Sequence, residues 1–566
     1  MLTNLRAILK GRALVFGSGS VQLLTPAARE RGPGAAVLLF AALVSLAALL
    51  PASLLFAEPG FIDAYYYFHV AANLAGHRGF TEDIIWTYLN DPEAITHPSN
   101  LYWMPLVSLV AAPFLAALGV SFRAAQIPLV ILSAMVPAAT ALVTWRWFGG
   151  WLKPTAAAAL VLFSGYYFVY WTAIDAFGLY ALAAGGSFLA TSSLLSGPLS
   201  PRRSLLLGAA MGISVAVAHL ARADGPLLLV TNLGLVLLRQ QGGHQPQSIP
   251  LSRSFASFRA RSVPVMAAAA TYLVAMSPWF LRNYLVTGTP LPGGGLQTMF
   301  LREYNDIFAY GIDFDLAYYL DQDKTELLAG KGAAALRNLG VLFGLEYWLI
   351  PFAVAGWLAA LRGGARDLFL PPLAYGVALY LIMTLVFTFP SGRGAMLHSG
   401  VALLPWLAMA AVNGVERAIH WAAGRRSHWV PTRAFRNFTG IFVAFAMGVS
   451  LYALVDQARN WSRQVDAYRE LAPIIFADRP DAVPLLLNAP GWWYATGRPA
   501  IQTPSNGPDA ALSAAARYGA THLVMEPAVP RAWEPFARAP ASNSRFRAIG
   551  QAHGGYTIYR IEFDGR

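Results

Sequence analysis

Long apolar runs recur along the chain and are separated by short polar segments. A helix needs about 20 mostly apolar residues to cross a bilayer, so runs of this length predict eleven membrane spans before residue 457. We place them at 35–57, 124–147, 154–173, 177–197, 204–221, 225–239, 263–282, 338–361, 368–389, 399–417 and 437–456. Only 12% of the residues are charged, against about 25% in soluble domains. The pattern therefore predicts an α-helical, polytopic membrane protein.

One further apolar run, at 101–119, decides the topology. If it spans the membrane, every later loop changes side; if it lies in the interface, nearly all clustered basic residues share the side of the N-terminus. Because basic residues concentrate in cytoplasmic loops, we interpret 101–119 as an interfacial helix anchored by Tyr102 and Trp103. The cytoplasmic set is then Arg6, Lys10, Arg12, Arg29, Arg31, Arg146, Lys153, Arg202, Arg203, Arg239, Arg253, Arg259, Arg261, Arg362, Arg366, Arg417, Arg425, Arg426 and Arg433.

The chain changes character after the last predicted span. Apolar runs suited to buried strands, at 483–487, 522–525 and 556–561, alternate with a helical pattern at 509–518. We therefore predict a basic cytoplasmic N-terminus (1–34), a membrane domain (35–456) whose first outer loop (58–123) carries juxtamembrane helices, and a small α/β periplasmic domain (457–566). The chain has no cysteine, which excludes disulfides and thiolate chemistry. It also shows no basic face on a soluble fold, which argues against nucleic acid as a partner.

The segment 58–100 is an acidic island in a protein of formal net charge +12. It holds one strong base, Arg78, and six acids, namely Glu58, Asp63, Glu82, Asp83, Asp91 and Glu93. Asp63 closely follows the first span, and aromatic neighbours that include Tyr65 can partly exclude water from it. A carboxylate so placed suits a general base acting on a hydroxyl. The alternative is an N-cap for a helix at 64–75, a position that favours aspartate.

Two other predicted outer turns carry acidic residues. Asp175 lies between two spans, where it can cap the next helix. Together with Asp63 it can also coordinate a divalent cation, or the two can divide the base and positioning roles. Arg222 and Asp224 fall at the break between two short spans. Ionisable groups at membrane depth point to function, and an ion pair that closes the turn is the alternative interpretation.

Several cations also collect on the predicted outer side, against the positive-inside trend. They are His97, Arg282, Arg302, Arg393 and His398. Guanidinium groups bind phosphate well, so a lipid phosphate is a fitting ligand for this set. For Arg282 the alternative is a side chain that snorkels to the lipid head groups.

Six short segments, in this order, are similar to a known family: FIDAYYYFHVAANLAGHRGF, THPSNLYWMPL, LARADGPLLL, PWFLRNYLVTGTPLP, PLLLNAPGWWYATGRPAIQTP and AARYGATHLVMEP. They resemble the GT-C superfamily of polyprenyl-phosphate-sugar-dependent glycosyltransferases, in particular the bacterial branch related to protein O-mannosyltransferases (family 39) and the lipid A aminoarabinose transferase. The resemblance covers most of the chain. It implies a GT-C membrane domain with a long first outer loop.

The resemblance also implies roles for individual residues. The catalytic aspartate of the family maps onto Asp63, and its second acidic position maps onto Asp175. Candidates for gripping the donor phosphate are His97, Arg222, Arg282 and Arg393, and further site candidates are Asp224, Tyr65 and His398. A divalent metal ion held by Asp63 and Asp175 is the cofactor that this arrangement suggests.

We therefore expect an inverting glycosyltransferase in the cytoplasmic membrane of a bacterium. It would move a hexosyl or pentosyl group from a polyprenyl phosphate, whose tail lies among membrane lipids, to an acceptor hydroxyl of a glycan, lipid or protein on the outer face. The alternatives are a transporter or flippase for lipid-linked glycans, and a glycan polymerase or ligase of related fold. Transporters tend to show internal repeats and polar residues at mid-membrane, whereas here the polar residues gather at one face and no repeat is visible.

Overall fold

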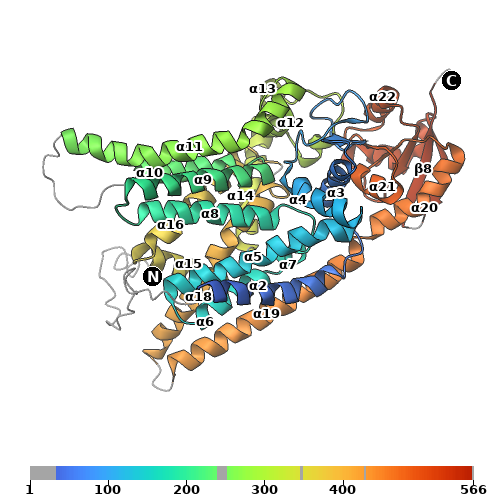
Figure 1. The fold of residues 1–566 in the computed structure, drawn as a ribbon. Coiled ribbons are helices and arrows are strands. Elements are labelled where there is room, and N and C mark those ends of the chain that lie inside the picture. Colours follow the sequence, from blue (N-terminus) through green and yellow to red (C-terminus); the bar gives the residue numbers. More distant parts are fainter. Residues whose placement is uncertain are drawn as a thin grey trace.

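The computed structural model describes residues 34–238, 251–344, 349–389, 391–425, 429–552 and 554–563. Long helices run side by side as a bundle, and a small domain that contains a β-sheet lies at one end of it (Figure 1). Some basic residues of the topology prediction lie outside the described residues, namely Arg6, Lys10, Arg12, Arg29, Arg31, Arg239 and Arg426.

The bundle is built from apolar helices. They are α2 Gly34–Ser53, α5 Phe122–Phe148, α6 Leu152–Leu162, α7 Tyr166–Tyr170, α8 Phe177–Leu195, α9 Pro201–Ala221, α10 Pro226–Leu238, α11 Leu251–Thr287, α14 Lys324–Gly344, α15 Ile350–Arg362, α16 Arg366–Leu385, α17 Ala395–His398, η5 Ser399–Leu403, α18 Leu404–Ala423 and α19 Pro431–Asn460. Among the described residues, eight helical segments are long and apolar enough to cross a membrane. The chain is therefore a multi-pass membrane protein, as predicted.

The prediction of one continuous span at 154–173 is wrong. The run is divided into α6 and α7, because Gly165 takes a positive φ of 62°, a backbone conformation that interrupts a helix. The amide of Gly165 donates a hydrogen bond to the hydroxyl of Ser450 on α19 (2.8 Å). This bond satisfies the freed backbone group inside the bundle, which a membrane protein requires at a helix break.

The predicted span at 338–361 has other bounds in the structure. Helix α14 begins earlier, at Lys324, and its described part ends at Gly344, and α15 covers Ile350–Arg362. Residues 345–348 of the predicted span lie outside the described residues. A search for apolar runs misses the first half of α14 because it carries charged residues such as Glu326. Each of the other nine predicted spans coincides with a described helix.

The first loop folds into short elements beside the bundle. They are α3 Ile62–Ala75, β1 Thr81–Glu82, β2 Ile84–Ile85, β3 His97–Pro98 and α4 Leu106–Leu118, and the later loop between α11 and α14 adds α12 Gly293–Gln297, η2 Thr298–Phe300, η3 Tyr304–Phe308 and α13 Leu316–Leu320. Helix α4 packs against α3 and α5. At 13 residues it is about 20 Å long, which is too short to cross a bilayer upright. The run at 101–119 therefore does not form a full span, in agreement with the interfacial interpretation.

The C-terminal domain is an α/β unit, as predicted. Its elements are α20 Arg463–Asp478, β4 Pro484–Leu486, α21 Ala489–Thr496, β5 Ala500–Gln502, α22 Pro508–Tyr518, β6 His522–Met525, η6 Arg531–Trp533, α23 Glu534–Arg538, η7 Pro540–Ser542, β7 Phe546–Ala552 and β8 Tyr556–Ile561. The strand order is β2-β5-β4-β6-β8-β7. Strands β2, β5, β4 and β6 are parallel, and β8 and β7 are antiparallel to their neighbours. Strands β5 and β7 were not predicted.

One strand of this sheet comes from the first loop. Ile84 and Ile85 of β2 pair with Ala500 and Ile501 of β5, and the hydroxyl of Tyr88 donates a hydrogen bond to the carbonyl of Gln502. Because paired strands lie only about 5 Å apart, the first loop and the C-terminal domain must lie on the same side of the membrane. The chain must therefore cross the membrane an even number of times between the first loop and the C-terminal domain. The predicted spans also give an even number when 101–119 does not span.

The C-terminal domain also holds the beginning of the first loop. Arg469 of α20 forms an ion pair with the buried carboxylate of Glu58 (3.0 Å). Gly60 has a φ of 94° and lies flat against the indole of Trp461, where a β-carbon would meet the ring at 2.3 Å. Only glycine fits this backbone conformation and this contact. The backbone three residues before Asp63 is therefore held in place.

Candidate active site

Asp63 lies in the first turn of α3. The alternative interpretation of Asp63 as the N-cap is wrong, because α3 begins one residue earlier and Phe61 occupies the N-cap position without a side-chain hydrogen bond. The helix therefore does not depend on the Asp63 carboxylate for capping. The side chain of Asp63 is half-buried, so that it combines a sheltered position with some access from outside.

Asp63 meets two further metal-ligating groups from distant parts of the chain. A side-chain ligand atom from each of Asp63, Asp175 and His398 lies within 4.8 Å of the other two. Asp175 lies in the turn between α7 and α8, and His398 is the last residue of α17. Its Nδ1 is 3.8 Å from Asp175 Oδ2, and both atoms are buried without a hydrogen-bond partner among the described residues.

Asp175 is held at the start of α8 by its other oxygen. Asp175 Oδ1 accepts a hydrogen bond from the amide of Ala176, although Ala176, and not Asp175, occupies the N-cap position of α8. The prediction that Asp175 caps the next helix is therefore wrong in the strict sense. The imidazole of His398 stacks on Phe177 with 4.6 Å between ring centroids, so both ligand candidates have fixed directions.

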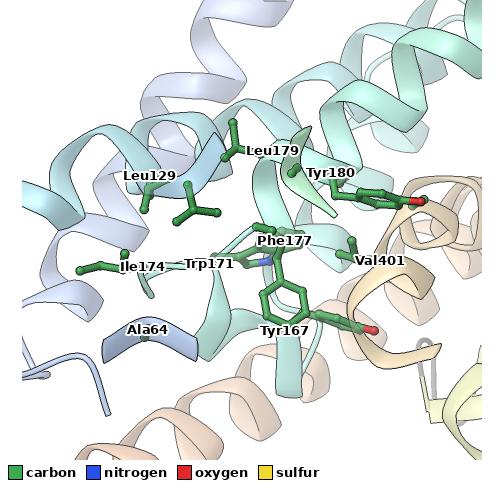
Figure 2. Close-up of a cluster of buried hydrophobic side chains, with 14 of the residues drawn as sticks. Ala64, Leu129, Tyr167, Trp171, Ile174, Phe177, Leu179, Tyr180 and Val401 are labelled. Atoms are coloured by element: carbon green, nitrogen blue, oxygen red, sulfur yellow. The ribbon is translucent and has the colours of Figure 1, made fainter. Parts of the chain in front are cut away.

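Buried hydrophobic side chains pack beside the cluster. Figure 2 shows Tyr167, Trp171 and Phe177 gathered between Ala64 on one side and Val401 on the other. Ala64 directly follows Asp63, and Trp171 and Phe177 are fully buried. Such surroundings exclude water and strengthen the electrostatic interactions of the neighbouring charged groups of the cluster.

Arg222 supplies the positive charge of the site. It follows the last residue of α9, and its Nε donates a hydrogen bond to the hydroxyl of Ser399 (2.8 Å) and lies 3.2 Å from Asp224 Oδ1. The ion pair that the alternative interpretation predicted for the turn is thus present. The charge of Arg222 also acts on both Asp63 and Asp175, so the ion pair and a role in the site coexist.

The two carboxyl groups have different affinities for a proton. Burial raises the pKa of Asp63 to about 6, although the charge of Arg222 and a hydrogen bond from the Trp103 side chain oppose the shift. Burial, followed by the negative charge of Asp63, raises the pKa of Asp175 well above its ordinary value. Asp63 is therefore the member of the pair that gives up its proton more readily, which makes it the better candidate for a base.

Two of the predicted phosphate-binding residues belong to separate contacts of the first loop, His97 within the loop and Arg282 on α11 beside it. His97 Nε2 is 2.7 Å from Glu82 Oε1, and its Nδ1 is 2.9 Å from the carbonyl of Ile95. Arg282 donates to the carbonyl of Ser99 (2.6 Å). The basic residue whose charge acts on both Asp63 and Asp175 is Arg222.

The remaining predicted residues border the cluster or face away from it. The guanidinium of Arg393 lies 5.0 Å from the ring centre of Tyr304, and the Tyr304 side chain senses the charges of both Asp63 and Arg393. The ring of Tyr65 faces Tyr494 on α21 of the C-terminal domain, at 5.2 Å. Arg393 is thus a neighbour of the cluster, whereas Tyr65 is part of a domain contact.

Sequence reasoning missed two residues that act on the charged groups. The hydroxyl of Ser399 accepts a hydrogen bond from Arg222, and the Trp103 side chain acts to lower the pKa of Asp63. Trp103 was predicted only as an interfacial anchor. No signal in the sequence relates it to a residue 40 positions earlier, because neither periodicity nor spacing reports such an interaction.

Comparison with protein-family models gives no match for this chain, and comparison with curated proteins gives none either. Solved structures, however, align over nearly its whole length. ArnT from Cupriavidus metallidurans bound to undecaprenyl phosphate aligns with a TM-score of 0.54 and 14% identity, over 94% of this chain and 98% of that one. In the apo state ArnT gives 0.55 and 13%, over 93% and 97%.

The chain has the GT-C fold. The fold that was inferred from six short segments is therefore confirmed. A looser alignment joins the chain to an oligosaccharyltransferase from Archaeoglobus fulgidus, with a TM-score of 0.48 and 14% identity over 95% of this chain and 75% of that one. Within the GT-C fold of this chain, the acidic cluster lies where the helical bundle meets the first loop, since Asp63 begins α3 and Asp175 precedes α8.

Proposed function

We propose that the protein is a glycosyltransferase that moves a sugar from a polyprenyl phosphate to an acceptor hydroxyl with inversion. The observation that carries the proposal is the meeting of Asp63, Asp175 and His398, with ligand atoms within 4.8 Å of one another, under the positive charge of Arg222. The cluster lies in a fold shared with ArnT, which was crystallised with undecaprenyl phosphate bound.

Asp63 has the properties of a general base for this transfer. Its pKa of about 6 leaves it ionised near pH 7 and still able to take a proton, which is the range in which a base is most effective. In the proposed step the acceptor oxygen forms a bond to the anomeric carbon, and its proton goes to Asp63. The bond from that carbon to the phosphate oxygen breaks, and the electron pair leaves with the lipid phosphate. One displacement of this kind inverts the anomeric configuration.

The leaving lipid phosphate is an anion and needs fixed positive charge rather than a strong acid. Arg222 provides a buried charge within reach of both carboxyl groups. Arg393, on the far side of Tyr304, is a second cation at the edge of the cluster. We assign these two residues to the phosphate, and His97 and Arg282 to the shape of the first loop, where their hydrogen bonds hold them.

The residues at the cluster also fit a divalent cation. Asp63 and Asp175 offer carboxylate oxygens and His398 offers a ring nitrogen, and a mixed set of this kind suits Mn²⁺ or Zn²⁺ better than Ca²⁺. Asp175 Oδ2 and His398 Nδ1 are buried without hydrogen-bond partners, as ligand atoms would be before they bind a metal. A bound divalent cation would supply positive charge that stabilises a leaving phosphate.

Removal of divalent metal is expected to abolish transfer, because the leaving phosphate then loses the positive charge that the cation would add to that of Arg222. Protein dialysed against EDTA should be inactive and should recover when Mn²⁺ is added. In His398→Gln the recovery should require more Mn²⁺, because one of the three ligands is lost. Full activity of a preparation that elemental analysis shows to be free of metal would contradict the metal assignment.

The proposed site faces the outside of a bacterial cytoplasmic membrane. Arg and Lys residues are concentrated in the predicted loops on the opposite side from the first loop, as is typical of cytoplasmic loops. Charged nucleotide sugars stay in the cytoplasm, so a sugar carried by a polyprenyl lipid is the donor available at that face.

The proposal is tested by a transfer assay with purified protein. Short-chain polyprenyl phosphates that carry different sugars are offered together with a membrane extract as acceptor, and release of lipid phosphate is measured. We expect release with at least one donor, dependent on the extract, and a product of inverted anomeric configuration. If no donor gives release, while a labelled lipid-linked glycan crosses the bilayer of reconstituted vesicles, the protein is a transporter and the proposal fails.

A further inference from the structure

We propose that Ser399 is a positioning residue for the transfer reaction. Its hydroxyl holds the guanidinium of Arg222 at Nε and leaves both terminal amino groups of that guanidinium to bind the phosphate of the donor. The inference rests on the proposed function, in which Arg222 is assigned to the lipid phosphate, and it names the residue that keeps Arg222 ready for that role.

The hydrogen bonds of Arg222 within the described part of the chain all use one nitrogen. Its Nε donates to the hydroxyl of Ser399 (2.8 Å) and to Asp224 Oδ1 (3.2 Å). Since Nε carries a single hydrogen, the two acceptors share it, and the hydroxyl is the nearer one. Neither terminal amino group of Arg222 has a hydrogen-bond partner among the described residues.

This geometry differs from that of an arginine that serves only to pair with a carboxylate. Arginine and carboxylate frequently form two parallel hydrogen bonds, from two nitrogens to two oxygens. Here the second oxygen, Asp224 Oδ2, is buried and has no hydrogen-bond partner among the described residues. The ion pair therefore has one point of contact on each side, and the other N–H groups of Arg222 stay available for an anion.

Ser399 preserves this geometry because it competes with Asp224 for the Nε hydrogen. Without the hydroxyl, the guanidinium can rotate toward Asp224 and bind both carboxylate oxygens. Asp224 would then occupy a terminal amino group of Arg222, and the phosphate would lose one of its two contacts. Bidentate contact is what suits arginine to phosphate, so the hydroxyl of Ser399 keeps the binding edge of Arg222 open.

Ser399 is itself held by the surrounding helices. It begins η5 directly after α17 and is fully buried. The hydroxyl of Tyr167 on α7 donates a hydrogen bond to the carbonyl of Leu397 (2.6 Å). The hydroxyl of Tyr375 on α16 lies 3.5 Å from the carbonyl of Ser399 and 2.8 Å from the hydroxyl of Tyr180 on α8. Side chains of three helices therefore fix the backbone that carries the Ser399 hydroxyl.

The same segment carries a member of the acidic cluster. His398 directly precedes Ser399, and its Nδ1 lies 3.8 Å from Asp175 Oδ2. The backbone that places His398 beside Asp175 therefore also places Arg222, through Ser399, next to the cluster. A phosphate bound by Arg222 is thereby brought to the group of side chains that contains Asp63.

The test measures binding of a short-chain polyprenyl phosphate without a sugar, so that it does not depend on transfer. In Ser399→Ala the affinity should fall about 10- to 100-fold, the typical effect of losing a hydrogen bond to a charged group. KM for the donor should rise by a similar factor. The matched control is Ser187→Ala, which should bind like wild type. Ser187 is also fully buried, and its hydroxyl accepts a hydrogen bond from Asn232 (3.1 Å), about three helical turns beyond Asp175.

Two further comparisons separate the hydroxyl of Ser399 from its shape and from other contacts. Ser399→Thr keeps a hydroxyl, whereas Ser399→Val has a methyl group in its place, so both crowd the site equally. The Thr variant should bind the polyprenyl phosphate about 10-fold more tightly than the Val variant. In the background Arg222→Met/Asp224→Leu, Ser399→Ala should cause no further loss, because a residue that acts through Arg222 is not additive with its removal.

Unchanged affinity in Ser399→Ala overturns the inference, and so do equal affinities of the Thr and Val variants or a full further loss in the background without Arg222. A loss that depends on the hydroxyl and on Arg222 supports it. The proposed function is judged separately by the transfer assay. If polyprenyl phosphate binds in a manner that depends on Ser399 but no donor is cleaved, the glycosyltransferase proposal fails and the phosphate site stands. If transfer occurs while Ser399→Ala binds like wild type, only the role of Ser399 fails.

Discussion

Asp63→Asn is expected to lower kcat by about 10²- to 10⁴-fold, the usual contribution of a general base. Asparagine has nearly the same shape as aspartate, but it cannot take the proton of the acceptor. Donor binding should remain, because removal of a negative charge beside Arg222 favours a phosphate. Single-turnover release of lipid phosphate, measured next to donor binding, separates the two effects.

The matched control for this variant is Asp91→Asn, an identical change within the same loop. Asp91 is exposed and forms an ion pair with Arg517, so its loss should leave kcat near wild type. Equal rates of release from wild type and Asp63→Asn, with both proteins folded and donor-bound, would remove Asp63 from the mechanism.

Arg222→Met is expected to impair both stability and transfer. The side chains of Arg222 and Asp224 are only 14% and 12% exposed, and Asp224 Oδ2 has no hydrogen-bond partner among the described residues. Removing one member of a buried ion pair typically destabilises a protein by about 3–5 kcal/mol, because the other charge stays buried and uncompensated. The rate of transfer should fall by about 10²- to 10³-fold, which is the usual effect of removing one preorganised group that stabilises the negative charge developing on the leaving phosphate. Thermal unfolding and lipid phosphate release measure the two losses.

A double variant distinguishes the two roles of Arg222. In Arg222→Met/Asp224→Leu the unpaired carboxylate is removed as well, so the melting temperature should recover, whereas transfer should stay low. Recovery of transfer together with stability would mean that Arg222 serves only to neutralise Asp224, and that the leaving phosphate depends on other cations.

The sequence predicts those parts of the fold that depend on local pattern. Most spans follow from the length of their apolar runs, and β6 and β8 follow from theirs. The break at Gly165 was missed because its cause, a hydrogen bond from that amide to Ser450, joins two helices that are far apart in the chain. Strand β2 has only two residues, too few for any periodicity, and its partner lies in another domain.

The candidate site was predictable in part for a topological reason. Once the outer turns are assigned to one side, Asp63, Asp175 and Arg222 must all lie at that end of the bundle, and the structure brings them together. His97 and Arg282 were placed on the same side by the same argument, but which way a side chain points depends on its neighbours. His97 contacts Glu82, and Arg282 donates a hydrogen bond to the carbonyl of Ser99. No rule of spacing predicts these contacts.

The pairing of β2 with β5 also sets an order of events during synthesis. Tyr88 and Gln502, which bond each other beside these strands, are 414 positions apart. At about 5–20 residues per second, the ribosome needs roughly 20–80 s to make the chain between them. Throughout that interval β2 has no sheet to join. The first loop therefore reaches its final contacts only after the C-terminal segment has been made and delivered to the same side of the membrane.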